Sequence, residues 1–204
     1  MSDSNSPLDF YFDFSSPYSY LMSERIDALA ARFGRKVRWH PILLGIVFKA
    51  NGSAPLTLQS TSKAAYSLLD FERSARFMGI LYRHPTRFPL ATQNAARAYY
   101  WLHGEDCALA RQFAHAVFRA LFIDDRDVSA PDTVLEIGAK IGVDRNRLEI
   151  ALQSPEMKER LKQEVDAALA LGVFGAPYIV IDGQPFFGAD RLPQIEKWLE
   201  TGGF

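Results

Sequence analysis

The chain has 204 residues, of which 48% are hydrophobic, and its 23 basic side chains nearly balance 24 acidic ones. This length predicts one large domain, or a domain with an insertion, with enough apolar residues for a sizeable core. The charge balance lacks the basic excess that nucleic acids and anionic membranes attract, so we expect neither as a partner.

The first residues, MSDSNSP, are polar and lack the charged and apolar regions of a signal peptide. No apolar run reaches the length of a membrane span. We therefore expect a cytoplasmic protein.

Residues 8–14 alternate strictly, with Leu8, Phe10, Phe12 and Phe14 facing one way, which predicts a strand. A helix should follow over residues 17–33, because Ser16 suits its N-cap and Pro17 its first position. An apolar face then continues until Gly34. The stretch KVRWHPILL, residues 36–44, predicts a second strand. The order strand, helix, strand predicts a right-handed crossover and parallel pairing of the two strands.

Residues 60–172 have the texture of helices with few strand signals. Helix starts are expected at Ser129, Asp144 and Ser154, which can cap helices, while Gly142 and Gly172 mark stops. Strand texture returns in PYIVIDGQPFFG, where Asp-Gly at 182–183 predicts a hairpin, and a final helix should cover LPQIEKWLE.

The single cysteine, Cys107, excludes an internal disulfide and a Cys-x-x-Cys redox pair. Because it lies in a helical pattern, we expect a small buried side chain rather than a nucleophile. The four histidines are scattered without the spacing of a metal site, so we expect no metal.

Ser16 allows three interpretations. It can be a helix N-cap and nothing more, since serine is among the preferred caps. It is a weak candidate for a nucleophile, because no neighbouring base and no Gly-x-Ser-x-Gly turn support it. It can also donate a hydrogen bond to a thiolate that a ligand brings to the helix N-terminus.

Four stretches, FYFDFSSPYSYL, HPILLG, KAAYSLLDFERSARFMGI and FGAPYIVIDGQPFFGADRL, together resemble the 2-hydroxychromene-2-carboxylate isomerases. These are relatives of the kappa-class glutathione transferases and, more distantly, of thioredoxin-fold disulfide oxidoreductases. The resemblance implies an α/β protein with a thioredoxin-like fold, residues 1–55 and 173–204, and a helical domain, residues 56–172, inserted between the βαβ and ββα halves. It also implies a homodimer that binds glutathione.

The resemblance also assigns residues to the glutathione site. Ser16 takes the place of the redox cysteine and supports the glutathione sulfur, and Ala176-Pro177 matches a cis-proline turn that pairs with the cysteinyl part. The GADR stretch matches the loop for the γ-glutamyl end, with Asp190 suited to its ammonium group. The full set implied by the family is Ser16, Pro17, Tyr18, Ala176, Pro177, Gly188, Ala189, Asp190 and Arg191.

The second substrate implied by the family is an aromatic bicyclic carboxylate, which needs polar donors, a cation and flat apolar walls. Lys49 and Asn51 in FKANGS are candidates for its contacts, although Asn-Gly also suits an ordinary solvated turn. Arg87 and Asn94 are weaker candidates for the pocket rim. Four further side chains at helical spacing predict a polar network that joins the domains: Lys63, Tyr66, Asp70 and Arg73.

The function implied is glutathione-dependent isomerisation of 2-hydroxychromene-2-carboxylate to trans-o-hydroxybenzylidenepyruvate in the breakdown of naphthalene-type aromatics. Two alternatives stay open. One is a kappa-like glutathione transferase that conjugates electrophiles. The other is a non-catalytic thioredoxin-fold binding module.

Overall fold

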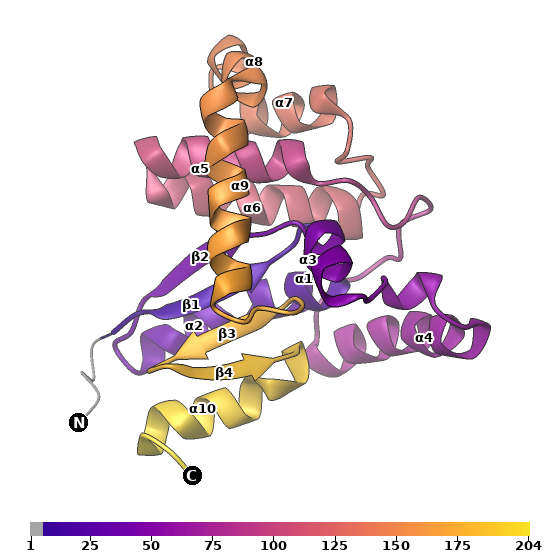
Figure 1. Cartoon of the computed structure of the whole chain (residues 1–204), viewed down its shortest axis with the longest axis vertical. Helices are drawn as coiled ribbons and strands as arrows, with labels where there is room; N and C mark the ends of the chain where they lie inside the picture. Colours follow the sequence, from indigo (N-terminus) through magenta and orange to yellow (C-terminus); the bar gives the residue numbers. More distant parts are fainter. Residues whose placement is uncertain (1–5) are drawn as a thin grey trace.

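A four-stranded mixed sheet forms the centre of the computed structural model, which describes residues 6–204 (Figure 1). The strands are β1 (Leu8–Phe12), β2 (Val37–Pro41), β3 (Tyr178–Ile181) and β4 (Gln184–Phe187), in the order β2-β1-β3-β4. β1 is parallel to β2, and the pairs β1–β3 and β3–β4 are antiparallel. Strands from both ends of the chain therefore share one sheet, and the thioredoxin-like α/β fold is confirmed.

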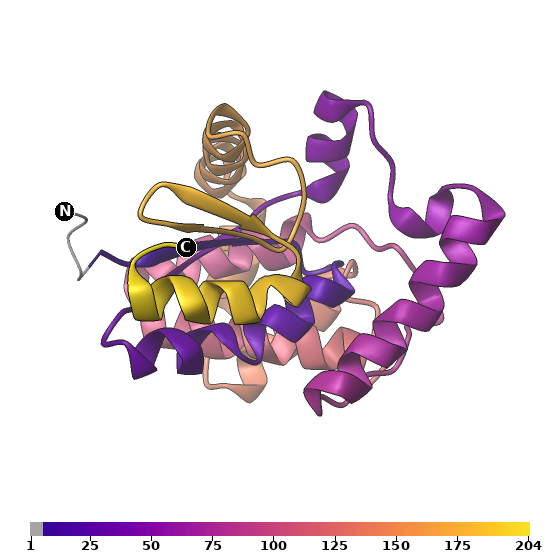
Figure 2. The same cartoon turned by 90° about the horizontal axis from the view of Figure 1, so that it is seen from below.

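The strand register gives the sheet two distinct faces. Phe10, Ile179 and Phe186 are direct neighbours across three strands, while Tyr11 and Tyr178 start a second row that faces the opposite way. Figure 2 shows α2 (Ile26–Arg32) and α10 (Leu192–Thr201) on one side of the sheet and α9 (Pro155–Ala170) on the other. Both faces are thereby covered, and β1 and β3 are largely buried, while three of the four residues of β4 are exposed.

Four further helices extend the same core. They are α5 (Gln93–Glu105), α6 (Cys107–Phe122), α7 (Pro131–Lys140) and α8 (Arg145–Gln153). Phe118 of α6 packs against the rings of Phe12 and Phe14, with ring centres 5.5 and 5.1 Å apart. The sheet and these helices are thus joined by shared aromatic packing, and a domain division at residues 55/56 and 172/173 stays a prediction.

The helix predicted over residues 17–33 is wrong as a single element, because the structure has α1 (Pro17–Ser23) and then α2. The hydroxyl of Ser23 donates to the carbonyl oxygen of Tyr20 at 2.7 Å, and Glu24 turns its side chain toward α6. The backbone leaves the helical path at Arg25. The first two strands are also shorter than predicted, ending at Phe12 and Pro41.

Residues 44–78 form an arm, of which the sequence patterns predicted the helical second half but not the first. It contains α3 (Leu44–Asn51), the short 3-10 helix η1 (Leu56–Leu58) and α4 (Thr61–Met78). The arm begins after β2, and Figure 2 shows α4 standing away from the sheet. FKANGS is therefore the end of a helix followed by a turn at Gly52, which has a φ of 67°.

Two of the three predicted helix starts are confirmed. Asp144 and Ser154 cap α8 and α9, accepting hydrogen bonds from the third helical N–H at 2.9 and 3.1 Å. The helix start predicted at Ser129 is wrong. The Ser129 N–H and hydroxyl both donate to Asp127, and Ala130 is the N-cap of α7. Gly142, which has a φ of 87°, directly follows the C-cap of α7 as predicted.

The expectation for Cys107 is wrong. It is the first residue of α6 and is exposed. The helix starts at the surface, where Asp106, Cys107 and Ala108 are all exposed, and burial begins only at Ala110. No helix within residues 6–204 is both long and apolar enough to cross a membrane.

Candidate active site

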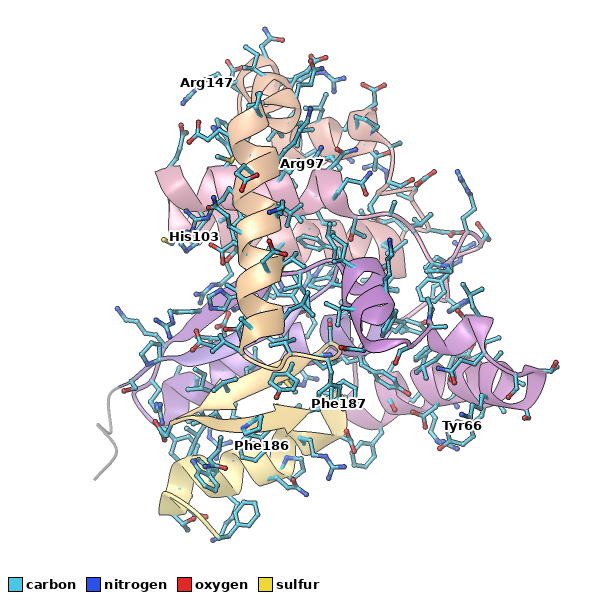
Figure 3. The ribbon with its side chains drawn as sticks, viewed as in Figure 1. Tyr66, Arg97, His103, Arg147, Phe186 and Phe187 are labelled. Atoms are coloured by element: carbon cyan, nitrogen blue, oxygen red, sulfur yellow. The ribbon has the colours of Figure 1, made fainter. Side chains whose placement is uncertain are left out.

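A cavity of about 1210 Å³ lies between the sheet and the arm. On one side it is lined by residues from 13–18, 174–177 and 187–193, which we call the sheet wall. On the other side it is lined by residues from 43–59 and 66–78, which we call the arm wall. Figure 3 labels one residue of each wall, Phe187 at the end of β4 and Tyr66 on α4.

Ser16 lies in the sheet wall at the start of α1 and is 5% exposed. Its hydroxyl oxygen accepts a hydrogen bond from the Ser19 N–H at 3.1 Å, so it is a true N-cap. The same hydroxyl donates to the carbonyl oxygen of Ala176 at 3.2 Å. That is long for an O–H···O bond, so a stronger acceptor in the cavity can compete for the proton.

The first turn of α1 leaves one backbone donor near Ser16. Pro17 has no N–H, and the N–H groups of Ser19 and Tyr20 donate to the side chain and carbonyl oxygen of Ser16. In the part of the chain that the structure describes, the Tyr18 N–H has no such acceptor. A ligand atom at the Ser16 hydroxyl therefore has a second donor within one residue.

Asp13, which the sequence patterns did not single out, fixes this wall. It is 3% exposed, and one carboxylate oxygen accepts from the Ser15 N–H and the Thr92 hydroxyl, both at 2.8 Å. The other accepts from the Leu44 N–H at 2.6 Å. Burial raises the pKa of the Asp13 carboxyl, while the donated hydrogen bonds favour its ionised form. The carboxylate thus joins the starts of α3 and α5 to the turn before Ser16.

The Ala176-Pro177 peptide bond is cis, as the family resemblance implied. The Pro177 carbonyl oxygen accepts from the Gly188 N–H at 3.0 Å, which holds the GADR loop beside the proline. Gly188 has a φ of 107°, and a Cβ there would stand 2.4 Å from a carboxylate oxygen of Asp190. Only glycine therefore fits this position.

Asp190 presents its carboxylate to solvent and to the cavity. Its side chain is 74% exposed, and its nearest cation is Arg191 at 3.5 Å. Ala189 beside it is buried. Ser16, Ala176 and Asp190 therefore share one wall, which offers a hydroxyl donor, the backbone of the bend at the cis-proline and an exposed carboxylate. This donor set fits a small peptide that has a thiol and an ammonium group.

The predicted polar network on α4 exists in part. The Tyr18 hydroxyl donates to Asp70, and Arg73 donates to Asp70 and, at 3.0 Å, to the Tyr66 hydroxyl oxygen. Burial, followed by the hydrogen bond to Asp70, raises the pKa of Tyr18, so this phenol stays protonated. Lys63 is exposed and lies outside the network.

The structure places the four predicted substrate residues outside the cavity lining: Lys49, Asn51, Arg87 and Asn94. Asn51 donates instead to the Phe174 carbonyl oxygen at 3.3 Å, and Arg87 pairs with Asp127. Asn94 is turned toward the loop before α7. Aromatic side chains line the cavity instead, and no sequence pattern marks them as a group. They are Phe48, Phe71, Phe77, Phe88, Phe174 and Phe187. Residues 6–204 contain no cluster of three or more potential metal ligands.

Residues 7–200 match the model of the DSBA-like thioredoxin domain family. A 2-hydroxychromene-2-carboxylate isomerase from Pseudomonas putida is 32% identical over 93% of this chain and 92% of its own length. The chain belongs to this isomerase family. The protein is therefore an enzyme of this family, because the similarity extends over almost the whole length of both chains.

This chain is also similar to a solved isomerase structure and to a glutathione transferase. A solved structure of a 2-hydroxychromene-2-carboxylate isomerase superposes with a TM-score of 0.85 at 29% identity, covering 95% of this chain and 94% of that one. A glutathione S-transferase kappa 2 from Caenorhabditis elegans is 28% identical over 93% of this chain and 90% of its own length. The family therefore joins isomerase-type and glutathione-transferase-type enzymes.

Proposed function

We propose that this protein is a glutathione-dependent isomerase that converts 2-hydroxychromene-2-carboxylate to trans-o-hydroxybenzylidenepyruvate. The observation that carries the proposal is that Ser16 lines the cavity at the start of α1, where the family resemblance puts the reactive group, while Cys107 is not among the cavity-lining residues. A sulfur nucleophile at Ser16 must then come from a ligand. The isomerase relatives support the substrate class.

The residues of the sheet wall support glutathione as that ligand. Ser16 can turn its hydroxyl from the Ala176 carbonyl oxygen to a thiolate, which is the stronger acceptor. Ala176 can then offer its backbone to a peptide as an added strand would. Asp190 can pair with the γ-glutamyl ammonium, and the loop brings the backbone N–H groups of Ala189 and Asp190 beside it, since the Gly188 N–H is taken by Pro177.

Bound glutathione supplies a thiolate whose reversible addition to a conjugated carbon turns a double bond into a single bond that can rotate. The protein's share is to orient and stabilise. Ser16 and the Tyr18 N–H hold negative charge at one place, and the phenylalanine side chains around the cavity exclude water and offer flat surfaces to an aromatic ring. Ser16 needs no base beside it, because it acts as a donor.

A kappa-like transferase is the second candidate, because the same sheet wall suits any reaction in which a thiolate attacks an electrophile and the kappa-class relatives support it. The remaining alternative, a binding module without catalysis, has no support among these relatives, which are enzymes. We also propose that the protein is a homodimer, in keeping with the family resemblance, and that it lies in the cytoplasm.

The test compares two serine caps. Ser16→Ala should lower turnover of 2-hydroxychromene-2-carboxylate about 100-fold, the scale for one lost donor to developing charge, and cost about 1 kcal/mol of stability as a lost cap. Ser154→Ala, which removes the cap of α9 far from the cavity, should cost the same stability and leave turnover unchanged. Conversion is followed spectroscopically, and omission of glutathione should suppress it.

Cys107→Ala serves as the thiol control and should leave turnover unchanged, because its sulfur lies outside the cavity lining. Normal turnover in Ser16→Ala would reduce Ser16 to a cap. Full activity without any added or copurified thiol would refute the use of glutathione. Formation of a stable glutathione adduct in place of the isomer would favour the transferase.

A further inference from the structure

A chain of hydrogen bonds joins α1, the helix that Ser16 caps, to α4 of the arm. It begins at the Tyr18 hydroxyl, passes through the carboxylate of Asp70 and the guanidinium of Arg73, and ends at the Tyr66 hydroxyl oxygen. Ser74 adds a donor to Asp70 at 3.4 Å. Asp70 is thus surrounded by donors. Partial burial raises the pKa of Asp70, but the hydrogen bonds from Tyr18 and Arg73 outweigh it and hold that pKa below its ordinary value, so Asp70 is charged.

Tyr66 is the end of this chain and differs from its other members. Its oxygen accepts from Arg73, and the Arg73 guanidinium also lies 5.4 Å from the centre of its ring. Among the hydrogen bonds of residues 6–204, the Tyr66 O–H donates to none. A phenol that accepts from a cation becomes a stronger donor, because the cation draws electron density from its oxygen. Tyr66 therefore offers the cavity a polarised proton.

The other charges around the cavity have partners. The charged side chains in the lining are Asp13, Asp70, Asp190 and Arg191. Asp13 is buried and saturated by its own donors, and Asp70 is matched by Arg73. Arg191 stands beside Asp190 in the sheet wall, at the end proposed for the γ-glutamyl group. On the arm wall, the support for a second negative charge comes from the Arg73–Tyr66 pair.

The same face of α4 also presents a surface for a flat ring. Phe71 and Phe77 line the cavity together with Tyr66, and the spacing of 66, 70, 71, 74 and 77 keeps these residues on one side of the helix. Phe71 packs edge-to-face on Tyr18, with ring centres 5.0 Å apart. An aromatic carboxylate could thus place its ring on the phenylalanines and its charge at Tyr66.

We propose that Tyr66, supported by Arg73, donates a hydrogen bond to the carboxylate of the second substrate. The carboxylate-binding group then lies on α4 and not on α3, where Lys49 and Asn51 stand. This inference rests on the proposed function only in taking the cavity as the second-substrate site.

The experiment measures binding and does not need turnover. Calorimetry with the full chain and saturating glutathione compares 2-naphthoate with 2-naphthamide, which has the same ring and no charge. Tyr66→Phe should weaken 2-naphthoate binding about tenfold, the scale of one hydrogen bond to a charged group, and leave 2-naphthamide unchanged. Arg73→Gln should weaken 2-naphthoate less. Leu69→Ala, on α4 but outside the lining, should change neither probe.

The outcomes separate this proposal from the proposed function. If Tyr66→Phe weakens the binding of both probes equally, Tyr66 does not recognise the carboxylate and the proposal fails. Unchanged 2-naphthoate binding in Tyr66→Phe would also overturn it, as would the absence of 2-naphthoate binding to the unmodified protein. If chromene carboxylate is turned over while its KM is unaffected by Tyr66→Phe, the isomerase stands and the role of Tyr66 fails. If 2-naphthoate binding depends on Tyr66 but chromene carboxylate is not isomerised, the role of Tyr66 stands and the isomerase proposal fails.

Discussion

The two walls of the cavity are built on different principles. In the sheet wall, Asp13 and Ser16 are buried, and hydrogen bonds from distant segments meet at Asp13. The arm wall consists of side chains on α3, η1 and α4, several of which are open to solvent; Phe77, which lines the cavity, is 90% exposed.

This difference separates two tasks. A group that stabilises charge must be held in place before the reaction, because reorganisation during the reaction costs free energy. A wall that receives flat apolar molecules can adjust side-chain positions at small cost. We therefore expect substitutions in the sheet wall to change stability and chemistry, and those in the arm wall to change substrate preference.

The largest effect should follow from Asp13→Ala. It removes an acceptor shared by three segments and leaves the N–H groups of buried Ser15 and half-buried Leu44 without their partner, which should cost about 3 kcal/mol of the free energy of unfolding. Phe77→Ala removes a far larger side chain but should change stability by less than about 0.5 kcal/mol, because that side chain is already exposed. Urea denaturation measures both, and similar losses would erase the distinction between the walls.

An intermediate effect is expected for Asp190→Asn. The substitution keeps the shape of the GADR loop but removes the charge proposed to face the γ-glutamyl ammonium, so glutathione binding should weaken by about 1–3 kcal/mol. Glu200→Gln, on α10 and outside the lining, is the matched control and should leave affinity unchanged. Equal glutathione affinity for Asp190→Asn and the unmodified chain, by calorimetry, would remove Asp190 from the site.

The same contrast explains what the sequence could predict. The alternation that begins at Leu8, the cap at Ser16 and the Asp-Gly hairpin at 182–183 are local patterns whose physics acts over a few residues, and the structure contains all three. Asp13 could not be recognised, because its partners Leu44 and Thr92 lie 31 and 79 residues away. Its place in the alternating strand looked like that of any polar residue.

The arm was the least predictable part. Lys49 and Asn51 were chosen from a loosely matched loop, and the helix α3 carries them away from the cavity lining. Nothing in the chain around residue 49 shows how that helix turns, because the arm's direction depends on contacts such as Leu44 with Asp13 and Tyr18 with Asp70. Residues on such a wall can be found only from the folded chain.

The smallest effect concerns the support of the sheet wall from behind. Glu24, at the end of α1, accepts from His115 at 3.2 Å and from Arg119 at 3.1 Å, both on α6. The hydrogen bond from His115, aided by Arg119 and opposed by partial burial, lowers the pKa of Glu24 below its ordinary 4.5. Glu24 is charged in this pairing, so it ties α1 to α6.

A carboxyl group whose pKa is lower in the folded state stabilises the fold above its unfolded pKa and loses that contribution as pH falls through its folded pKa. The unmodified protein should therefore lose stability more steeply below pH 4.5 than Glu24→Gln, whose side chain does not titrate. The two free energies of unfolding should differ by about 1 kcal/mol or less near neutral pH and converge in acid, because Arg119 is largely exposed and water screens its charge. Urea denaturation at a series of pH values measures both curves. Parallel curves would mean that Glu24 does not help to hold α1, and that the sheet wall is fixed from the cavity side by Asp13.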